Sequence, residues 1–140
     1  MIDSMHKMSR FFHKPAFGML LIRIATGYIF FTHGLSKVTN LDMPIGMMMH
    51  FGLPGWLGIF IAWLEVIGGI ALILGVLTRV FGVMLGIEML VAIYLTGFSS
   101  GLGTHDLEII LGLNSFALAL AGSGKIRLTN IFEIDEHTHT

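Results

Sequence analysis

The sequence has no cysteine and few charged residues, and each shortage excludes a class of function. Without cysteine the chain has no disulfide, no thiolate metal site and no dithiol relay. Charged residues make up 12% of the 140 residues and hydrophobic ones 54%, whereas a soluble domain carries about 25% charged residues. A chain with room for about one domain could not bury so much apolar surface in a soluble core. The net charge of −1 leaves no basic surface to neutralise phosphates, so we expect a lipid bilayer and no nucleic acid as partner.

Long apolar runs are what the sequence has instead. A membrane-spanning helix needs roughly 20 residues, because the backbone must satisfy its hydrogen bonds internally across the hydrocarbon core. Four runs approach or reach that length, although the last is short: 17–36, 56–77, 80–98 and 107–122. The second and third are separated by Thr78 and Arg79 alone, which predicts a tight helical hairpin. The sequence therefore predicts an all-α transmembrane four-helix bundle.

Small residues inside these runs predict close helix packing. Gly58 with Ala62, and Gly82 with Gly86, each form a pair of small residues four positions apart. Such pairs let two helix backbones approach closely in a membrane. We expect both pairs to lie at helix–helix contacts.

Basic residues outside the apolar runs predict the orientation. Cytoplasmic loops carry an excess of lysine and arginine. With four spans, Lys37 lies on one side and six residues lie on the other: Lys7, Arg10, Lys14, Arg79, Lys125 and Arg127. Both termini are therefore predicted to be cytoplasmic, with segment 1–16 before the membrane domain 17–122, an external loop 37–55 and a tail 123–140. The first run continues without a small-residue cleavage site, so we expect the first span to be retained.

Ionisable residues within the apolar runs predict a central polar site. A charge at the bilayer centre costs on the order of 2.5–3.5 kcal/mol, so it usually pairs or serves a function. At about 1.5 Å per residue, four helices each bring one polar group to a similar depth: Arg23, Glu65, Glu88 and Asn114. We predict that Arg23 holds one carboxylate. Because like charge and loss of water both favour a neutral carboxyl group, we expect one glutamate to be protonated. The alternative is that these residues only lock the helices together.

A second polar set lies towards the predicted external face: His33, Lys37, His105 and Glu108. Lys37 continues the helix face that carries Arg23, which makes an external vestibule leading to the central site plausible; ordinary interfacial residues would give the same pattern. The run 43–50 is rich in methionine and ends in His50, ligands that suit Cu(I). Contiguous methionines also fit an apolar segment on the membrane surface, and we predict no metal site.

These residues, in this order, resemble a known family. The matching elements extend from about residue 17 to 130: Arg23, Gly27, Phe30, His33-Gly34, Lys37, Glu65, Gly68-Gly69, Gly75, Thr78-Arg79, Glu88 and Gly122-x-Gly124-x-x-Leu128. The pattern resembles the DoxX family of small four-helix membrane proteins. The chain departs from it at 128–130, Leu-Thr-Asn, where the family commonly has Ser-Leu-Asp. The resemblance implies a membrane component of redox chemistry, since some members resemble subunits of a thiosulfate:quinone oxidoreductase and others resemble membrane partners of oxidative-stress enzymes.

The polar residues within the apolar runs and the family resemblance together predict a subunit of a quinone-linked redox assembly. We expect it in the cytoplasmic (inner) membrane of a bacterium or archaeon. The polar site would bind a quinone or supply its protons. Electrons would come from a redox protein partner, because the chain has no flavin or dinucleotide fingerprint, and we do not expect catalysis by this chain alone. Two alternatives stay open: a non-catalytic anchor for soluble oxidoreductases, and a small-molecule or proton carrier. The carrier would require a homo-oligomer, because the chain lacks inverted repeats.

Overall fold

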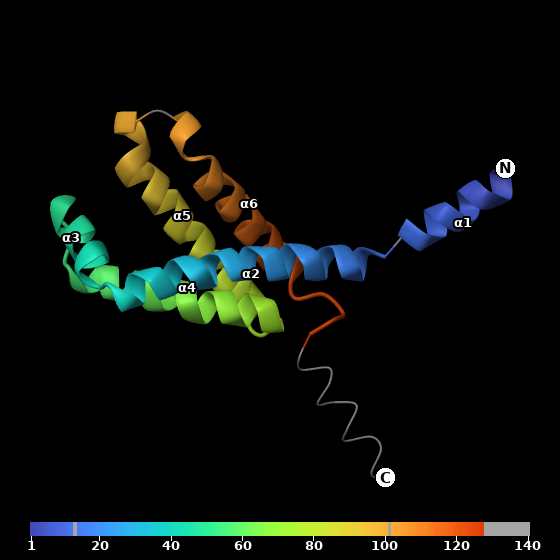
Figure 1. Cartoon of the computed structure of the whole chain (residues 1–140), viewed down its shortest axis with the longest axis horizontal. Helices are drawn as coiled ribbons and strands as arrows, with labels where there is room; N and C mark the ends of the chain where they lie inside the picture. Colours follow the sequence, from blue (N-terminus) through green and yellow to red (C-terminus); the bar gives the residue numbers. More distant parts are fainter. Residues whose placement is uncertain (13, 101, 128–140) are drawn as a thin grey trace, which may run out of the picture.

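The computed structural model describes residues 1–12, 14–100 and 102–127, and within these ranges the regular structure is helical throughout (Figure 1). The elements follow one another as α1 (Ile2–Phe12), α2 (Pro15–Thr39), α3 (Asp42–His50), α4 (Trp56–Leu74), α5 (Thr78–Ser100), η1 (Leu102–Thr104) and α6 (Asp106–Ala121). The prediction of an all-α protein is confirmed. Leu128 of the C-terminal motif and the rest of the predicted tail, 128–140, lie outside the described residues.

Three of the helices are long and apolar enough to cross a membrane: Pro15–Thr39, Trp56–Leu74 and Thr78–Gly97. They overlap the first three predicted spans, 17–36, 56–77 and 80–98, with different ends, and they make this an integral membrane protein. The fourth predicted span, 107–122, corresponds to α6, which has 16 residues and is shorter than the roughly 17 that a spanning helix needs at minimum. A fourth crossing and the orientation remain predictions.

Two further helices, α1 and α3, form where the sequence predicted only a cytoplasmic segment and an external loop. Helix α1 extends away from the other helices in Figure 1, and it exposes Ile2, Met5 and Met8 at helical spacing. Helix α3 packs on α4. A Cβ atom added to Gly58 would lie 2.4 Å from the Pro44 carbonyl oxygen. Gly58 therefore serves the contact of α4 with the short helix α3.

Helices α2, α4, α5 and α6 pack mainly as two pairs, α2 with α4 and α5 with α6 (Figure 1). In the first pair Gly27 and Gly69 face one another so closely that a Cβ on either would lie 2.6 Å from the other's carbonyl oxygen. In the second pair a Cβ on Gly82 would lie 2.7 Å from the Ser115 carbonyl oxygen, and one on Gly86 would lie 2.9 Å from the Phe116 ring. Gly82 and Gly86 thus lie at a helix–helix contact, as their spacing predicts.

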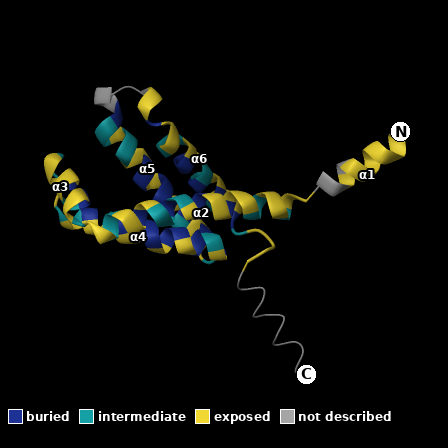
Figure 2. Cartoon of the chain, in the orientation of Figure 1, coloured by how far each residue is buried: buried dark blue, intermediate teal, exposed yellow. Residues whose placement is uncertain are grey.

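The core lies between the two pairs, and the outward faces of the helices are exposed (Figure 2). Buried hydrophobic residues from all four helices form one cluster: Phe30, Leu64, Leu72, Leu85, Met89, Leu111 and Leu118. Large aliphatic side chains are also exposed on these helices, among them Leu21, Ile67, Leu90 and Leu113. Exposed apolar surface of this extent marks a face that meets lipid or another protein.

The turn between α4 and α5 is a Schellman motif. The Gly75 N–H bonds to the Leu72 carbonyl oxygen at 3.3 Å and the Val76 N–H to that of Ala71 at 2.9 Å. Gly75 has a φ of +75°, which glycine adopts without steric cost. Leu77, the residue before α5, has a φ of +49°, which is uncommon for a side chain of its size. Neither of these two hydrogen bonds involves the Ile73 carbonyl oxygen, which stays open to another donor.

Candidate functional site

A partly buried ion pair joins α2 to α4. Lys37 Nζ lies 2.7 Å from Glu65 Oε1, with 23% of the lysine side chain and 3% of the glutamate side chain exposed. Gly34, one turn before Lys37, makes this approach feasible: a Cβ there would lie 2.8 Å from Glu65 Cβ. A lysine placed near the end of α2 thus extends its long aliphatic stem along the helix interface and brings its charge to the middle of α4.

Glu88 of α5 completes this group, which we call the Lys37–Glu65–Glu88 cluster. Its carboxyl group is a neighbour of the Glu65 carboxyl group, and Lys37 is near enough to act on it electrostatically. Glu65 Oε2 and Glu88 Oε2 are both buried and have no hydrogen-bond donor in the described part of the chain. Two carboxyl groups therefore face a single ammonium group in a site shielded from water.

Asn114, which was predicted to join the central site, makes a different contact. Its Nδ2 atom donates to Thr26 Oγ1 at 3.3 Å, which links α6 to α2. Its neighbour Ser115 donates to the Leu111 carbonyl oxygen of its own helix at 2.7 Å. Asn114 therefore bridges the two helix pairs through a neutral hydrogen bond.

Among the described residues Arg23 pairs with no carboxylate, so the predicted pairing with Glu65 or Glu88 is wrong. Its side chain is 2% exposed. One guanidinium nitrogen, Nη1, donates to the Ser123 carbonyl oxygen, and Nη2 donates to the Ile73 carbonyl oxygen at 3.4 Å. The C-terminal end of a helix is its negative pole, and its last carbonyl groups lack partners within the helix. Arg23 therefore caps α4 and ties it to the segment after α6, while Lys37 takes the carboxylate.

The predicted external set separates into two places. Lys37 belongs to the central cluster. His33 is exposed and turns its Nδ1 atom to the Ile29 carbonyl oxygen of its own helix, 2.8 Å away. His105 is buried just before α6, with Nδ1 3.8 Å from Glu108 Oε2. The methionines of 43–50 do not converge, since Met48 is buried while Met43, Met47 and Met49 are exposed.

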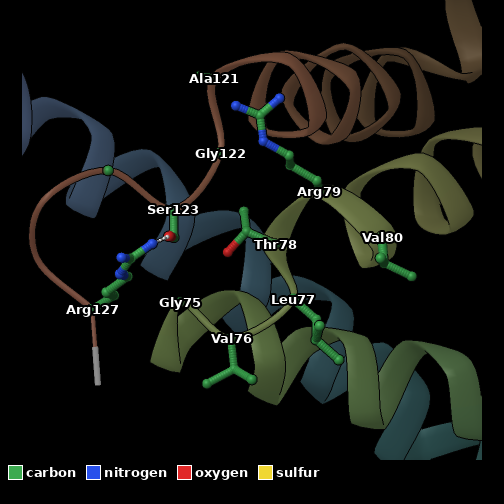
Figure 3. Close-up of a pocket in the computed structure, with 11 residues that line it drawn as sticks. Gly75, Val76, Leu77, Thr78, Arg79, Val80, Ala121, Gly122, Ser123 and Arg127 are labelled. Atoms are coloured by element: carbon green, nitrogen blue, oxygen red, sulfur yellow. Dashed lines mark hydrogen bonds between the residues drawn. The ribbon is translucent and has the colours of Figure 1, made fainter. Parts of the chain in front are cut away.

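A second polar region lies at the opposite end of α2 from Lys37. A pocket of about 610 Å³ opens between the α4–α5 turn and the segment that follows α6 (Figure 3). We call it the helix-end pocket; its lining residues are 75–80, 121–124 and Arg127. The segment after α6 reaches this position because Gly122 and Gly124 have φ values of +80° and +74°. Arg127 donates to Ser123 Oγ at 3.4 Å on one side of the pocket.

Sequence reasoning missed two features of these sites. It placed Lys37 in the external set, although it noted that Lys37 continues the helix face of Arg23; that shared face was the signal for a place in the central site. It also quoted Thr78-Arg79 and Gly122-x-Gly124 as separate motifs. In the structure both motifs line the helix-end pocket.

The comparisons with known proteins agree with this architecture. The DoxX family model matches residues 18–97. CatD of Bacillus subtilis (strain 168), whose name gives it provisionally as an oxidoreductase, is 37% identical over 107 residues, which cover 76% of this chain and 80% of CatD. An uncharacterized protein of Haemophilus influenzae is 30% identical over 129 residues, which cover 86% of this chain and 93% of that protein. No solved structure matches. On the family match and the CatD relationship, this chain belongs to the DoxX family.

Proposed function

We propose that this chain is a membrane subunit of a quinone-linked redox assembly, and that the Lys37–Glu65–Glu88 cluster exchanges protons with the quinone. The observation that carries the proposal is the 2.7 Å ion pair of Lys37 with Glu65, against which a second buried carboxyl group lies. Reduction of a quinone consumes one proton for each electron. Within the hydrocarbon layer those protons must come from a protein side chain, and a carboxyl group is a suitable donor.

Two carboxylate oxygens of the cluster lack a hydrogen-bond donor among the described residues, which supports a shared proton. Glu65 Oε2 and Glu88 Oε2 are both buried acceptors without a donor among the described residues, and a buried unsatisfied acceptor costs about 1–3 kcal/mol. One proton placed between them satisfies both oxygens. It also reduces the charge of the cluster from −1 to zero, because Lys37 neutralises the other carboxylate. A group that holds one exchangeable proton in this way can give it to a bound substrate.

The electrons have to come from a partner protein in this proposal. The sequence has no cysteine and no dinucleotide fingerprint. The oxidoreductase name of CatD belongs to that protein, and it supports a redox assembly for this one. We further propose four crossings with both termini in the cytoplasm, in the inner membrane. That topology places Lys37 towards the external end of the cluster and α1 beside a cytoplasmic partner.

Quinone binding tests this proposal without knowledge of the electron donor. A short-chain ubiquinone is titrated into the purified protein, and quenching of the Trp56 and Trp63 fluorescence reports its binding. The change Glu88→Gln should weaken binding, and in the intact complex it should slow quinone reduction by roughly 100-fold. Glu108→Gln is the matched control, because Glu108 lies beside His105 near the start of α6. Equal quinone binding and reduction by the wild type and Glu88→Gln would contradict the proposal.

A non-catalytic anchor is the second candidate, and the basic residues at the helix-end pocket favour it. Arg79 and Arg127 line that pocket, at the end of α2 that α1 precedes. An anchor would bind its partner through this end and use the buried cluster for packing alone. Replacing Glu65 and Glu88 by glutamine would then leave partner capture and quinone reduction unchanged, whereas the proton-exchange proposal predicts capture without reduction.

A further inference from the structure

The helix-end pocket has the chemistry of an anion site, and three of its features lead to that inference. The first is position. The pocket lies where α5 begins, and α5 is a helix of 23 residues. The first N–H groups of a helix have no partner within the helix, and they form its positive pole. An anion placed at such an end accepts hydrogen bonds from these backbone groups.

The second feature is Thr78, the first residue of α5. Its side chain is 3% exposed, and its Oγ1 atom has no hydrogen-bond partner among the described residues. In Figure 3 the hydroxyl group points into the pocket, towards the side of Ser123 and Arg127. A buried hydroxyl group without a partner costs about 1–3 kcal/mol. A ligand oxygen in the pocket would satisfy it.

The third feature is uncompensated positive charge. Arg79 lines the pocket, and its Nε atom lies 3.2 Å from the position of a Cβ on Gly122. Arg23 lies behind the opposite wall, because a Cβ on Gly75 would be 2.8 Å from its Cζ atom. Within residues 1–12, 14–100 and 102–127, neither Arg23 nor Arg79 forms an ion pair. The described lining residues include no aspartate or glutamate.

We propose that the helix-end pocket binds a phosphate group. Thr78 Oγ1 and the N–H groups at the start of α5 donate to the phosphate oxygens, and Arg79 supplies the charge. Arginine and phosphate match in geometry, since the guanidinium fork meets two oxygens at once. The phosphate group comes either from the headgroup of an anionic lipid or from a soluble phosphate compound. The site is separate from the Lys37–Glu65–Glu88 cluster and does not depend on the quinone proposal.

The experiment has two arms that distinguish these sources. In the first, native mass spectrometry measures the binding of phosphatidylglycerol, with phosphatidylcholine as the reference lipid. In the second, calorimetry measures the binding of inorganic phosphate to protein in detergent without anionic lipid. Both arms use the wild type, Thr78→Val, which keeps the side-chain shape, and Arg79→Gln. The matched controls are Thr39→Val, at the other end of α2, and Arg10→Gln on α1.

We expect the wild type to bind at least one probe, and we expect each pocket variant to bind it about tenfold more weakly, because each loses a charged hydrogen bond. The controls should bind like the wild type. Binding of phosphatidylglycerol alone assigns the site to a lipid headgroup, and binding of inorganic phosphate assigns it to a soluble compound. If Thr78→Val does not fold, Arg79→Gln gives the result, and Arg79→Lys should restore part of the binding. The proposal is overturned if the wild type binds neither probe above the reference, or if the controls lose as much affinity as the pocket variants.

Discussion

Lys37 Nζ lies 2.7 Å from Glu65 Oε1 across the contact between α2 and α4, in the place that the sequence had assigned to Arg23. The register of the two antiparallel helices explains this pairing. Gly34 faces Glu65 and Val66, and Gly27 faces Gly69 and Ile73. Arg23 lies one turn before Gly27 on α2, which places it beside the C-terminal end of α4. From there its side chain is too far along α4 to reach Glu65.

The ion pair predicts a large loss of stability when either partner is removed alone. Lys37→Met leaves the Glu65 carboxylate buried without its counter-charge, which we expect to cost about 3 kcal/mol. Glu65→Gln in the same chain should recover much of that loss, because the amide carries no charge. Unfolding in a denaturing detergent titration measures both variants and the double variant. A loss in the double variant equal to the sum of the two single losses would show that the pair is not coupled.

Removal of the Arg23 side chain should act on the segment after α6, and the glutamate cluster should not change. Arg23→Gln loses the charged hydrogen bonds to the Ser123 and Ile73 carbonyl oxygens. We expect faster proteolysis within 122–127 and a loss of stability of about 2–3 kcal/mol. The infrared carbonyl band of a protonated carboxyl group should stay at its wild-type position. A shifted band would instead place Arg23 in electrostatic contact with Glu65 or Glu88.

A helix could be predicted where the pattern of apolar residues within its own segment is sufficient to define it. Apolar runs of sufficient length predicted α2, α4 and α5 and a short connection between the last two. The predicted position of that connection, Thr78-Arg79, is wrong: α4 ends at Leu74, and Thr78 is the first residue of α5. Helix α1 was missed because its 11 residues carry polar and apolar side chains in similar number. Helix α3 was missed because Pro44 and Gly46 in so short a segment resemble loop composition; Pro44 is tolerated there because it lies in the first turn.

The pairing within the site was not predictable, because it depends on the relation between segments. Depth along the membrane normal places Arg23, Glu65 and Glu88 at similar levels, but a depth carries no information on helix rotation or register. Both Arg23 and Lys37 are long enough to reach in either direction along α2. The choice between them was decided by the contacts of Gly27 and Gly34 with α4, and by the Ser123 carbonyl group, which comes from a segment 100 residues away.

Close packing of α2 on α4 predicts different effects for two glycine substitutions. A Cβ on Gly69 would lie 2.6 Å from both the Gly27 carbonyl oxygen and the Phe31 nitrogen, which are backbone atoms that cannot turn away. Gly69→Ala should therefore cost about 1–3 kcal/mol. Gly18→Ala on α2 is the control, because no atom lies within 4 Å of its Cβ position, and alanine there should add up to about 1 kcal/mol of helix stability. Equal stability of Gly69→Ala and Gly18→Ala in a thermal unfolding assay would contradict the close approach.

The absence of native cysteine allows a direct test of whether α6 crosses the membrane. Single cysteines at Ser4, Gly46, Gly103 and Lys125 are labelled in intact cells with a maleimide that does not cross membranes. Gly46 and Gly103 are suitable positions, because no atom lies within 4 Å of a Cβ at either. With four crossings and cytoplasmic termini, the cysteines at 46 and 103 should react at once, and those at 4 and 125 only after the cells are permeabilised. If α6, with its 16 residues, does not cross, the cysteines at 103 and 125 react alike. That result would separate Arg79, at the start of α5, from Arg127, after α6, by the width of the membrane, whereas both residues line the helix-end pocket in the structure.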